Sequence, residues 1–327
     1  MSHYIITHSV LLHFLLGLLS DPSHNKWNNH TLIEGYAWHV GIKFYKSLSL
    51  LFIQMFLSLR LAPLLPENIH FIAIDFPGHG KSSHRWPGMP YTHFEFIADV
   101  KKVVSQLGWE KFSIIAHSLG ANVASLYAGA FPDEVEKLIA IDIRPPSEVL
   151  LPKVISSDNP ADVLAYYARQ MSDNKTATPR IYKTVESAAE RRQKTFLSYT
   201  LRKEDALLLT SRATKKTSDG VIFSHDPLLR ALAVPFIIPH WSLISVLSKI
   251  QCAVLVLEAT ESKLFEDFEQ ARMEHLGVIY EHANPKMWKS VKGNHHAHLE
   301  NPEQVALQIK EFLALCRSHD YSLQSKL

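Results

Sequence analysis

The stretch Ile114-Ile-Ala-His-Ser-Leu-Gly120 decides the fold expected for this chain. A short β-branched run ends there in Ala-His-Ser-Leu-Gly, and an apolar, helix-compatible segment follows at once over residues 121–130. Strand, sharp turn and helix in succession are typical of a turn that presents a nucleophilic serine. Small neighbours matter because such a turn strains the backbone at the serine and leaves no room for larger side chains. Ala116 replaces the usual first glycine, and Ser118 is the candidate nucleophile, with a helix cap as its alternative role.

Strands and helices alternate on both sides of this stretch. Buried-strand runs predict strands at 69–74, 112–116, 137–141 and 253–257, with a short strand at 288–291. Apolar residues at helical spacing predict helices at 92–107, 119–130, 265–276 and 303–315. The alternation predicts an α/β fold whose mostly parallel sheet is covered by helices on both faces.

Two segments depart from the alternation. After Pro145-Pro146, residues 145–248 are more charged and contain helical stretches, such as 161–171 and 199–210, which predicts a helical insertion. Residues 1–63 form an atypical N-terminal segment without a clear pattern. We therefore expect a core at 64–144 and 249–316, a cap at 145–248 and a flexible tail at 317–327.

Composition excludes several classes of partner. Lys and Arg number 34 against 32 Asp and Glu, with no long run of either sign, so nucleic acid is not an expected partner. The apolar runs at 10–19 and 48–59 are shorter than the roughly 18–20 residues of a spanning helix, so no membrane span is expected. Cys252 and Cys316 lie far apart without CxxC spacing, which favours a reducing compartment. No cofactor is expected.

Residues from three separate stretches complete a pattern. Ser118 follows one strand, Asp142 ends the next, and His295 lies in the tail stretch Gly293-Asn-His-His-Ala-His-Leu-Glu-Asn-Pro302. Serine, then acid, then histidine is the order found in α/β-hydrolases. Together with the loop Asp75-Phe-Pro-Gly-His-Gly-Lys-Ser82, these stretches carry the resemblance. From about residue 64 to 315 the chain resembles the α/β-hydrolase superfamily, and most closely the serine hydrolase-like proteins.

The resemblance implies an α/β-hydrolase fold with a helical cap inserted after the strand that ends at Asp142. It also selects the catalytic histidine, which in the family pattern stands five residues before the Glu of a Leu-Glu-x-Pro stretch, here His295. Such a base is what makes a serine hydroxyl nucleophilic. His296 and His298 are expected to pack or form hydrogen bonds. Histidines at i, i+1 and i+3 in one turn make a poor chelate, so no metal site is expected.

The acid of the site is open between two turns. Many relatives carry it in a Gly-x-x-Asp turn after the strand that corresponds to 253–257, but here this turn reads Ala259-Thr-Glu-Ser262. Ser262 stands at the expected acid position, with Glu261 beside it. Some relatives place the acid one strand earlier, at Asp142. We favour Asp142, with Glu261 as the alternative and Glu258 as a further possibility. Whichever residue is the acid must orient the histidine and stabilise its charged form.

The oxyanion hole is the main departure from the family. The backbone N–H of Leu119 should supply one donor, because it lies at the positively polarised start of the next helix. The second donor normally comes from a His-Gly loop after an earlier strand. Residues 43–62 hold an apolar stretch without turn residues instead, so the first strands are expected to be missing or altered. An N-terminus changed by splicing or by an incorrect gene prediction would explain this departure.

Two functions follow from these features. The first is a serine hydrolase, an enzyme that acts by acyl transfer on an ester, thioester or amide of a small molecule, with carboxylic esters favoured. The second is a catalytically impaired protein of the same fold that only binds, because the His-Gly loop is absent. A dehalogenase or epoxide hydrolase would need a carboxylate where Ser118 stands. The chain does not identify the substrate, which the cap would select.

The last three residues, Ser325-Lys-Leu327, match the peroxisomal address that an import receptor reads at a free C-terminus. Residues 320–324 before them are polar, as an accessible tail requires. We expect a peroxisomal protein with the import receptor as a partner, and a cytoplasmic location as the alternative.

Overall fold

A computed structural model describes most of the core and part of the insertion. The described residues are 29–33, 36–43, 48–53, 60–67, 69–86, 89–143, 161–162, 165, 168–169, 179–195, 201–229, 240–262 and 269–324.

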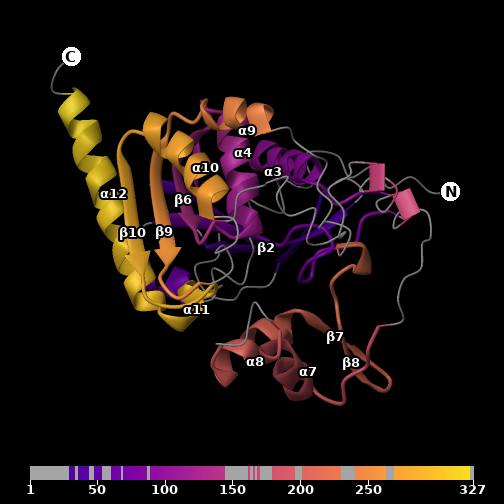
Figure 1. Cartoon of the computed structure of the whole chain (residues 1–327). Coiled ribbons are helices and arrows are strands. Elements are labelled where there is room, and N and C mark those ends of the chain that lie inside the picture. The colour runs from indigo at the N-terminus through magenta and orange to yellow at the C-terminus, as the bar shows by residue number, and fades with distance from the viewer. Residues whose placement is uncertain are drawn as a thin grey trace.

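An eight-stranded sheet forms the centre of the molecule (Figure 1). Its strands, in spatial order, are β1 (Asn29–Ile33), β2 (Tyr36–Lys43), β4 (Ile69–Ile74), β3 (Leu48–Ile53), β5 (Phe112–His117), β6 (Val135–Ile141), β9 (Ala253–Ala259) and β10 (Lys286–Val291). The six strands from β4 to β10 in this order run parallel, and β1 and β2 are antiparallel at one edge. The predicted mostly parallel sheet is therefore confirmed.

Helices cover both faces of the sheet. One face carries α3 (His93–Leu107), α4 (Leu119–Ala130), α9 (His240–Leu247) and α10 (Glu269–His282), and the other carries the short 3-10 helix η1 (Ala62–Leu64) and α12 (Pro302–Gln324). Strand residues alternate between the two cores, because successive side chains of a strand point to opposite faces. In β5, Ile114 packs with the first group of helices and Ile115 with the second. Such burial on both faces explains why β5 is buried along its whole length.

The first strands differ from the sequence-based expectation. Residues 29–53 form β1, β2 and β3, and β3 pairs with both β4 and β5, where Ile53 lies beside Ala116. The sheet is therefore continuous on the side of Ser118 where a strand was expected to be missing or altered. A parallel strand buried on both faces is a continuous apolar run, which periodicity alone does not separate from a helical segment. The residues that follow β3, 54–59, lie outside the described part of the chain.

The insertion contains a β-hairpin as well as helices. Two helices, α7 (Val185–Gln193) and α8 (Lys203–Arg212), precede the hairpin strands β7 (Thr214–Thr217) and β8 (Gly220–Phe223). The helix expected at 199–210 overlaps α8, and most of 161–171 lies outside the described residues. The end of the segment expected as cap, α9, packs against the core through Leu243 and Leu247.

Ionic contacts hold α8 against the core. Asp205, which is fully buried, accepts hydrogen bonds from Arg60, just before η1, at 2.7 Å and from Arg202 at 2.8 Å. Arg212 pairs with Asp75, which follows the carboxyl end of β4. These pairs place the cap at the carboxyl ends of the parallel strands, beside α11 (Ala297–Glu300) (Figure 1). Ligands of open parallel sheets bind at this end.

Across the described residues, no helix combines the length and the apolar character that crossing a bilayer requires. Of the tail expected at 317–327, residues 317–324 form the last part of α12. Residues 325–327 lie outside the described part, so the peroxisomal address stays a prediction.

Candidate active site

Ser118 occupies a strained turn between β5 and α4. Its φ of 53° and ψ of −120° lie in a backbone region where residues other than glycine are seldom found. The Ser118 N–H donates to the carbonyl of Ile141 on the neighbouring strand, and its carbonyl accepts from the N–H groups of Ala121 and Asn122. Strain of this kind persists only where the surroundings hold it, and it concentrates at functional sites.

The backbone N–H of Leu119 is available for a ligand. It is the first residue of α4, where N–H groups lack a partner within the helix and the helix dipole is positive. Among the described residues this N–H has no hydrogen-bond acceptor. An N–H in this position can donate to an oxygen that develops negative charge, which is the role that the sequence predicts for Leu119.

The structure brings His295 and Asp142 together. The Nδ1 atom of His295 lies 2.7 Å from Oδ2 of Asp142, and both side chains are buried. Because the carboxylate can only accept, Nδ1 donates its proton to this bond and the other ring nitrogen, Nε2, is left as an acceptor. Asp142 follows β6 directly with a φ of 42°, a left-handed conformation that Asp tolerates better than most residues.

Three donors converge on the Asp142 carboxylate. Besides His295, the Ala259 N–H donates to Oδ1 at 3.3 Å and the Ser262 hydroxyl donates to Oδ2 at 2.9 Å. Both residues belong to the end of β9 and the turn after it. The turn after β9, where the sequence resemblance places the acid of many relatives, therefore helps to hold a carboxylate that comes from the neighbouring strand.

The other two candidate acids lie elsewhere. Glu261 is exposed, and its backbone N–H donates to the carbonyl of Gly293 at 2.9 Å. Glu258 accepts a hydrogen bond from the indole N–H of Trp288 at 2.6 Å. Of the three carboxylates weighed from the sequence, Asp142 is the one that the described contacts join to His295.

The tail stretch has its own framework of hydrogen bonds. The side-chain oxygen of Asn294 accepts the His295 N–H at 2.7 Å, and Glu300 accepts the Asn294 N–H at 2.7 Å. Gly293 has a φ of 136°, and a Cβ placed there would lie 2.9 Å from the Glu300 carboxylate. These contacts explain the pattern of Gly293, Asn294 and Glu300 around His295. In the sequence Glu300 only marks the spacing to the histidine, and its hydrogen bond with the Asn294 N–H could not be predicted from that spacing.

Three more histidines pack around His295. The Nε2–H of His117 donates to the His295 carbonyl at 2.6 Å, and the ring centroids of these residues are 4.5 Å apart. The ring centroids of His296 and His298 lie 5.5 and 4.4 Å from that of His117. Burial, with the neighbouring imidazoles as a smaller cause, lowers the pKa of His298 to about 3 and the pKa values of His117 and His296 well below the ordinary range. All three rings are therefore neutral at physiological pH.

Known proteins match this chain over most of its length. Residues 50–302 match the family described as the alpha/beta hydrolase fold. The chain is 35% identical over 267 residues to a serine hydrolase-like protein of Danio rerio, covering 77% of this chain and 76% of the relative. It is 30% identical over 259 residues to a probable serine hydrolase of Drosophila melanogaster, covering 78% and 76%.

Solved structures share the fold at lower identity. A hypothetical protein from Pseudomonas aeruginosa PAO1 has a TM-score of 0.71 at 24% identity, over 89% of this chain and 99% of that one. The thioesterase domain from a curacin biosynthetic pathway has a TM-score of 0.71 at 21% identity, over 86% and 98%. These likenesses show the fold alone, whereas the family match and the relatives support a hydrolase. The chain belongs to the α/β-hydrolase superfamily and is close to the serine hydrolase-like proteins.

Proposed function

We propose that this protein is a serine hydrolase that acts by acyl transfer on an ester, thioester or amide of a small molecule. Ser118 is the nucleophile, His295 the general base and Asp142 the acid. The observation that carries the proposal is the buried 2.7 Å contact between His295 Nδ1 and Asp142 Oδ2. Ser118, in a strained strand-to-helix turn, donates its N–H to the carbonyl of Ile141, the residue before Asp142. A strained strand-to-helix turn is what a nucleophile elbow requires, which supports the proposal.

Each residue has one task in the reaction. His295 Nε2 takes the hydroxyl proton as Ser118 Oγ attacks the acyl carbon, and Asp142 stabilises the imidazolium that forms. The Leu119 N–H donates to the oxygen that gains negative charge at the acyl carbon. His295 then gives its proton to the leaving group, and a water molecule, activated in the same way, hydrolyses the acyl-enzyme.

A covalent probe tests the proposal directly. Purified protein is treated with a fluorophosphonate and the adduct is detected by intact mass. We expect one adduct on the wild type and on Ser211→Ala, which changes an exposed serine of α8, and none on Ser118→Ala. The absence of an adduct on wild-type protein that circular dichroism shows to be folded would favour the impaired, binding-only alternative.

The peroxisomal location is a separate proposal that rests on the sequence Ser325-Lys-Leu327. A fluorescent protein fused to the N-terminus leaves this tail free for the import receptor. We expect punctate fluorescence that overlaps a peroxisomal marker and becomes diffuse when residues 325–327 are deleted. Diffuse fluorescence from the intact fusion would indicate the cytoplasmic alternative.

A further inference from the structure

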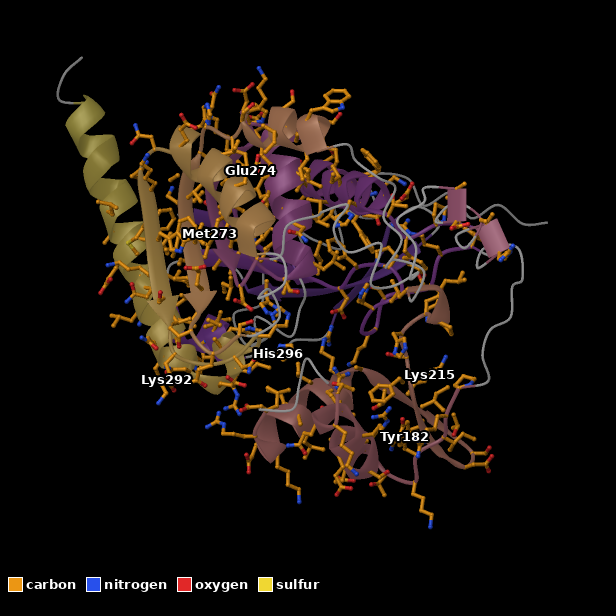
Figure 2. All side chains as sticks on the ribbon, in the orientation of Figure 1. Tyr182, Lys215, Met273, Glu274, Lys292 and His296 are labelled. Atoms are coloured by element: carbon orange, nitrogen blue, oxygen red, sulfur yellow. The ribbon has the colours of Figure 1, made fainter. Side chains whose placement is uncertain are left out.

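Three buried imidazoles meet beside the proposed catalytic residues. His117 ends β5, and His296 and His298 belong to the turn and short helix that follow β10. One nitrogen atom from each ring lies within 4.8 Å of the others. The exposed fractions are 1% for His117, 8% for His296 and 0% for His298. Figure 2 shows His296 on the side of the core that faces the cap. We call these three residues the histidine cluster.

The cluster is not the one that the sequence suggested. The tail histidines His295, His296 and His298 made a poor chelate, because they share one turn. In the structure His295 is bonded to Asp142, and His117 from a distant strand takes its place beside His296 and His298. Ligands from two separate segments can surround an ion in a way that neighbours in one turn cannot.

His117 has the tautomer of a metal ligand. Its Nε2 must carry the proton, because the partner at 2.6 Å is the His295 carbonyl, which only accepts. Its Nδ1 therefore has a free lone pair, and this atom is buried without a hydrogen-bond partner among the described residues. Histidines that bind metals usually donate their second N–H to a carbonyl or carboxylate in this way.

His296, like His117, has an unpaired ring nitrogen. Its Nδ1 is buried and lacks a partner among the described residues. A buried polar atom without a hydrogen bond is unfavourable and rare in folded proteins. The two unpaired nitrogen atoms belong to rings whose centroids are 5.5 Å apart, and one cation between the rings would satisfy both. His298 completes the group, with its ring 4.4 Å from that of His117.

The spacing of the rings suits a small ion. Tetrahedral Zn²⁺ with Zn–N bonds of 2.0–2.1 Å places ligand nitrogens about 3.3 Å apart and imidazole centroids about 5 Å apart. The centroid separations in the histidine cluster are 4.4, 5.5 and 5.7 Å. Rotation of the rings, with shifts of roughly an ångström, would bring the nitrogens to bonding distance.

We propose that His117, His296 and His298 bind a divalent transition-metal ion, Zn²⁺ being the best match, and that the bound ion suppresses acyl transfer at Ser118. Imidazole ligands suit Zn²⁺, Cu²⁺ and Ni²⁺, and three histidines leave a fourth position open for a small ligand.

The suppression rests on the proposed hydrolase function. His295 must keep its orientation to take the proton of Ser118 during acyl transfer. Its ring centroid lies 4.5 Å from that of His117 and 5.3 Å from that of His296, and its carbonyl accepts the Nε2–H of His117. The rings of His117 and His296 must turn to bind the ion, so they displace His295. A small misplacement of a catalytic group lowers the rate strongly, so the bound ion slows acyl transfer.

Metal binding is measured on the full chain after treatment with a chelator and dialysis. We expect one Zn²⁺ per chain in equilibrium dialysis, with a dissociation constant of about 1 µM or lower, and a tetrahedral visible spectrum with Co²⁺. His296→Gln and His298→Asn should each weaken binding at least about 100-fold, because a three-ligand site loses one ligand. The control His282→Gln changes an exposed histidine of α10 and should bind as the wild type does.

Fluorophosphonate labelling tests whether the bound ion suppresses acyl transfer at Ser118. With one equivalent of Zn²⁺ the labelling rate of the wild type and of His282→Gln should fall at least about tenfold. His296→Gln should keep its own metal-free rate under the same conditions. Folded wild type that binds no ion, or variants that both bind as the wild type does, would overturn the site.

Two further outcomes distinguish the metal site from the suppression and from the hydrolase function. Binding that leaves the labelling rate unchanged would overturn the suppression. Binding by a protein that is never labelled, even without metal, would support the site and refute the hydrolase function instead.

Discussion

Two turns at the carboxyl end of the sheet differ in what they contribute to the site. The strands β6 and β9 are parallel neighbours, with Ile141 beside Leu257, so the residues after them lie close together. The turn after β6 supplies the Asp142 carboxylate, whereas the turn after β9 supplies the Ser262 hydroxyl, and the two side chains share a hydrogen bond at 2.9 Å. Orientation of the histidine depends on where the carboxylate lies in space, so the carboxylate can come from the end of either of two adjacent strands.

The two candidate acids, Asp142 and Glu261, differ in burial and in hydrogen bonding. Asp142 is 2% exposed and accepts hydrogen bonds from His295, Ser262 and a backbone N–H, so its orientation is fixed and its charge is stabilised. Glu261 is exposed, and water competes for its carboxylate. An oriented, water-excluded carboxylate stabilises a charged histidine far better than a solvated one.

The largest effect is expected from Asp142→Asn. The amide can no longer stabilise the imidazolium and favours the wrong histidine tautomer, a change that lowers turnover about 10⁴-fold in a comparable triad. The measurement is the rate constant of fluorophosphonate labelling, with thermal unfolding as the check on folding. A loss smaller than about tenfold in a folded variant would contradict the assignment of the acid to the turn after β6.

A transplant of the acid should recover part of this loss. Asp142→Ser alone removes the carboxylate, and adding Ser262→Asp restores one from the turn after β9, where many relatives are expected to carry it. The hydroxyl at 142 then takes the role that Ser262 has now. We expect the double variant to label at least about tenfold faster than Asp142→Ser, which is a coupling of neighbouring residues. Equal rates would show that the two turns are not interchangeable.

Sequence and structure agree where the signals are local. The turn around Ser118 and the tail around His295 are encoded by consecutive residues, so both positions could be predicted from patterns of a few residues. The choice between Asp142 and Glu261 could not, because each follows a strand and the strand order that places β6 between β5 and β9 is a non-local property. The contact between His117 and His295, 178 positions apart, could not be predicted for the same reason. The strand β3 could not be predicted because an apolar run suits both a buried strand and a helix.

Ser262→Ala tests the supporting role of the turn after β9. The variant removes one of the donors to Asp142 Oδ2, and hydrogen bonds to a charged group contribute about 1.5–3 kcal/mol. We expect about a tenfold lower labelling rate, with Ser262→Thr, which keeps the hydroxyl, closer to the wild type. If Ser262→Ala labels at the wild-type rate, the hydroxyl packs beside the acid without orienting it.

Glu261→Gln should have the smallest effect, although this carboxylate stands next to the position where relatives are expected to carry the acid. Its side chain is exposed, and the contact that holds the turn is made by its backbone N–H to Gly293, which the substitution keeps. A surface change of this kind alters free energies by about 0.5 kcal/mol or less, which corresponds to roughly a twofold change in rate. A loss comparable to that of Asp142→Asn would mean that the turn after β9 moves Glu261 inward during the reaction. The labelling rates of the two isosteric variants therefore decide which strand end supplies the acid.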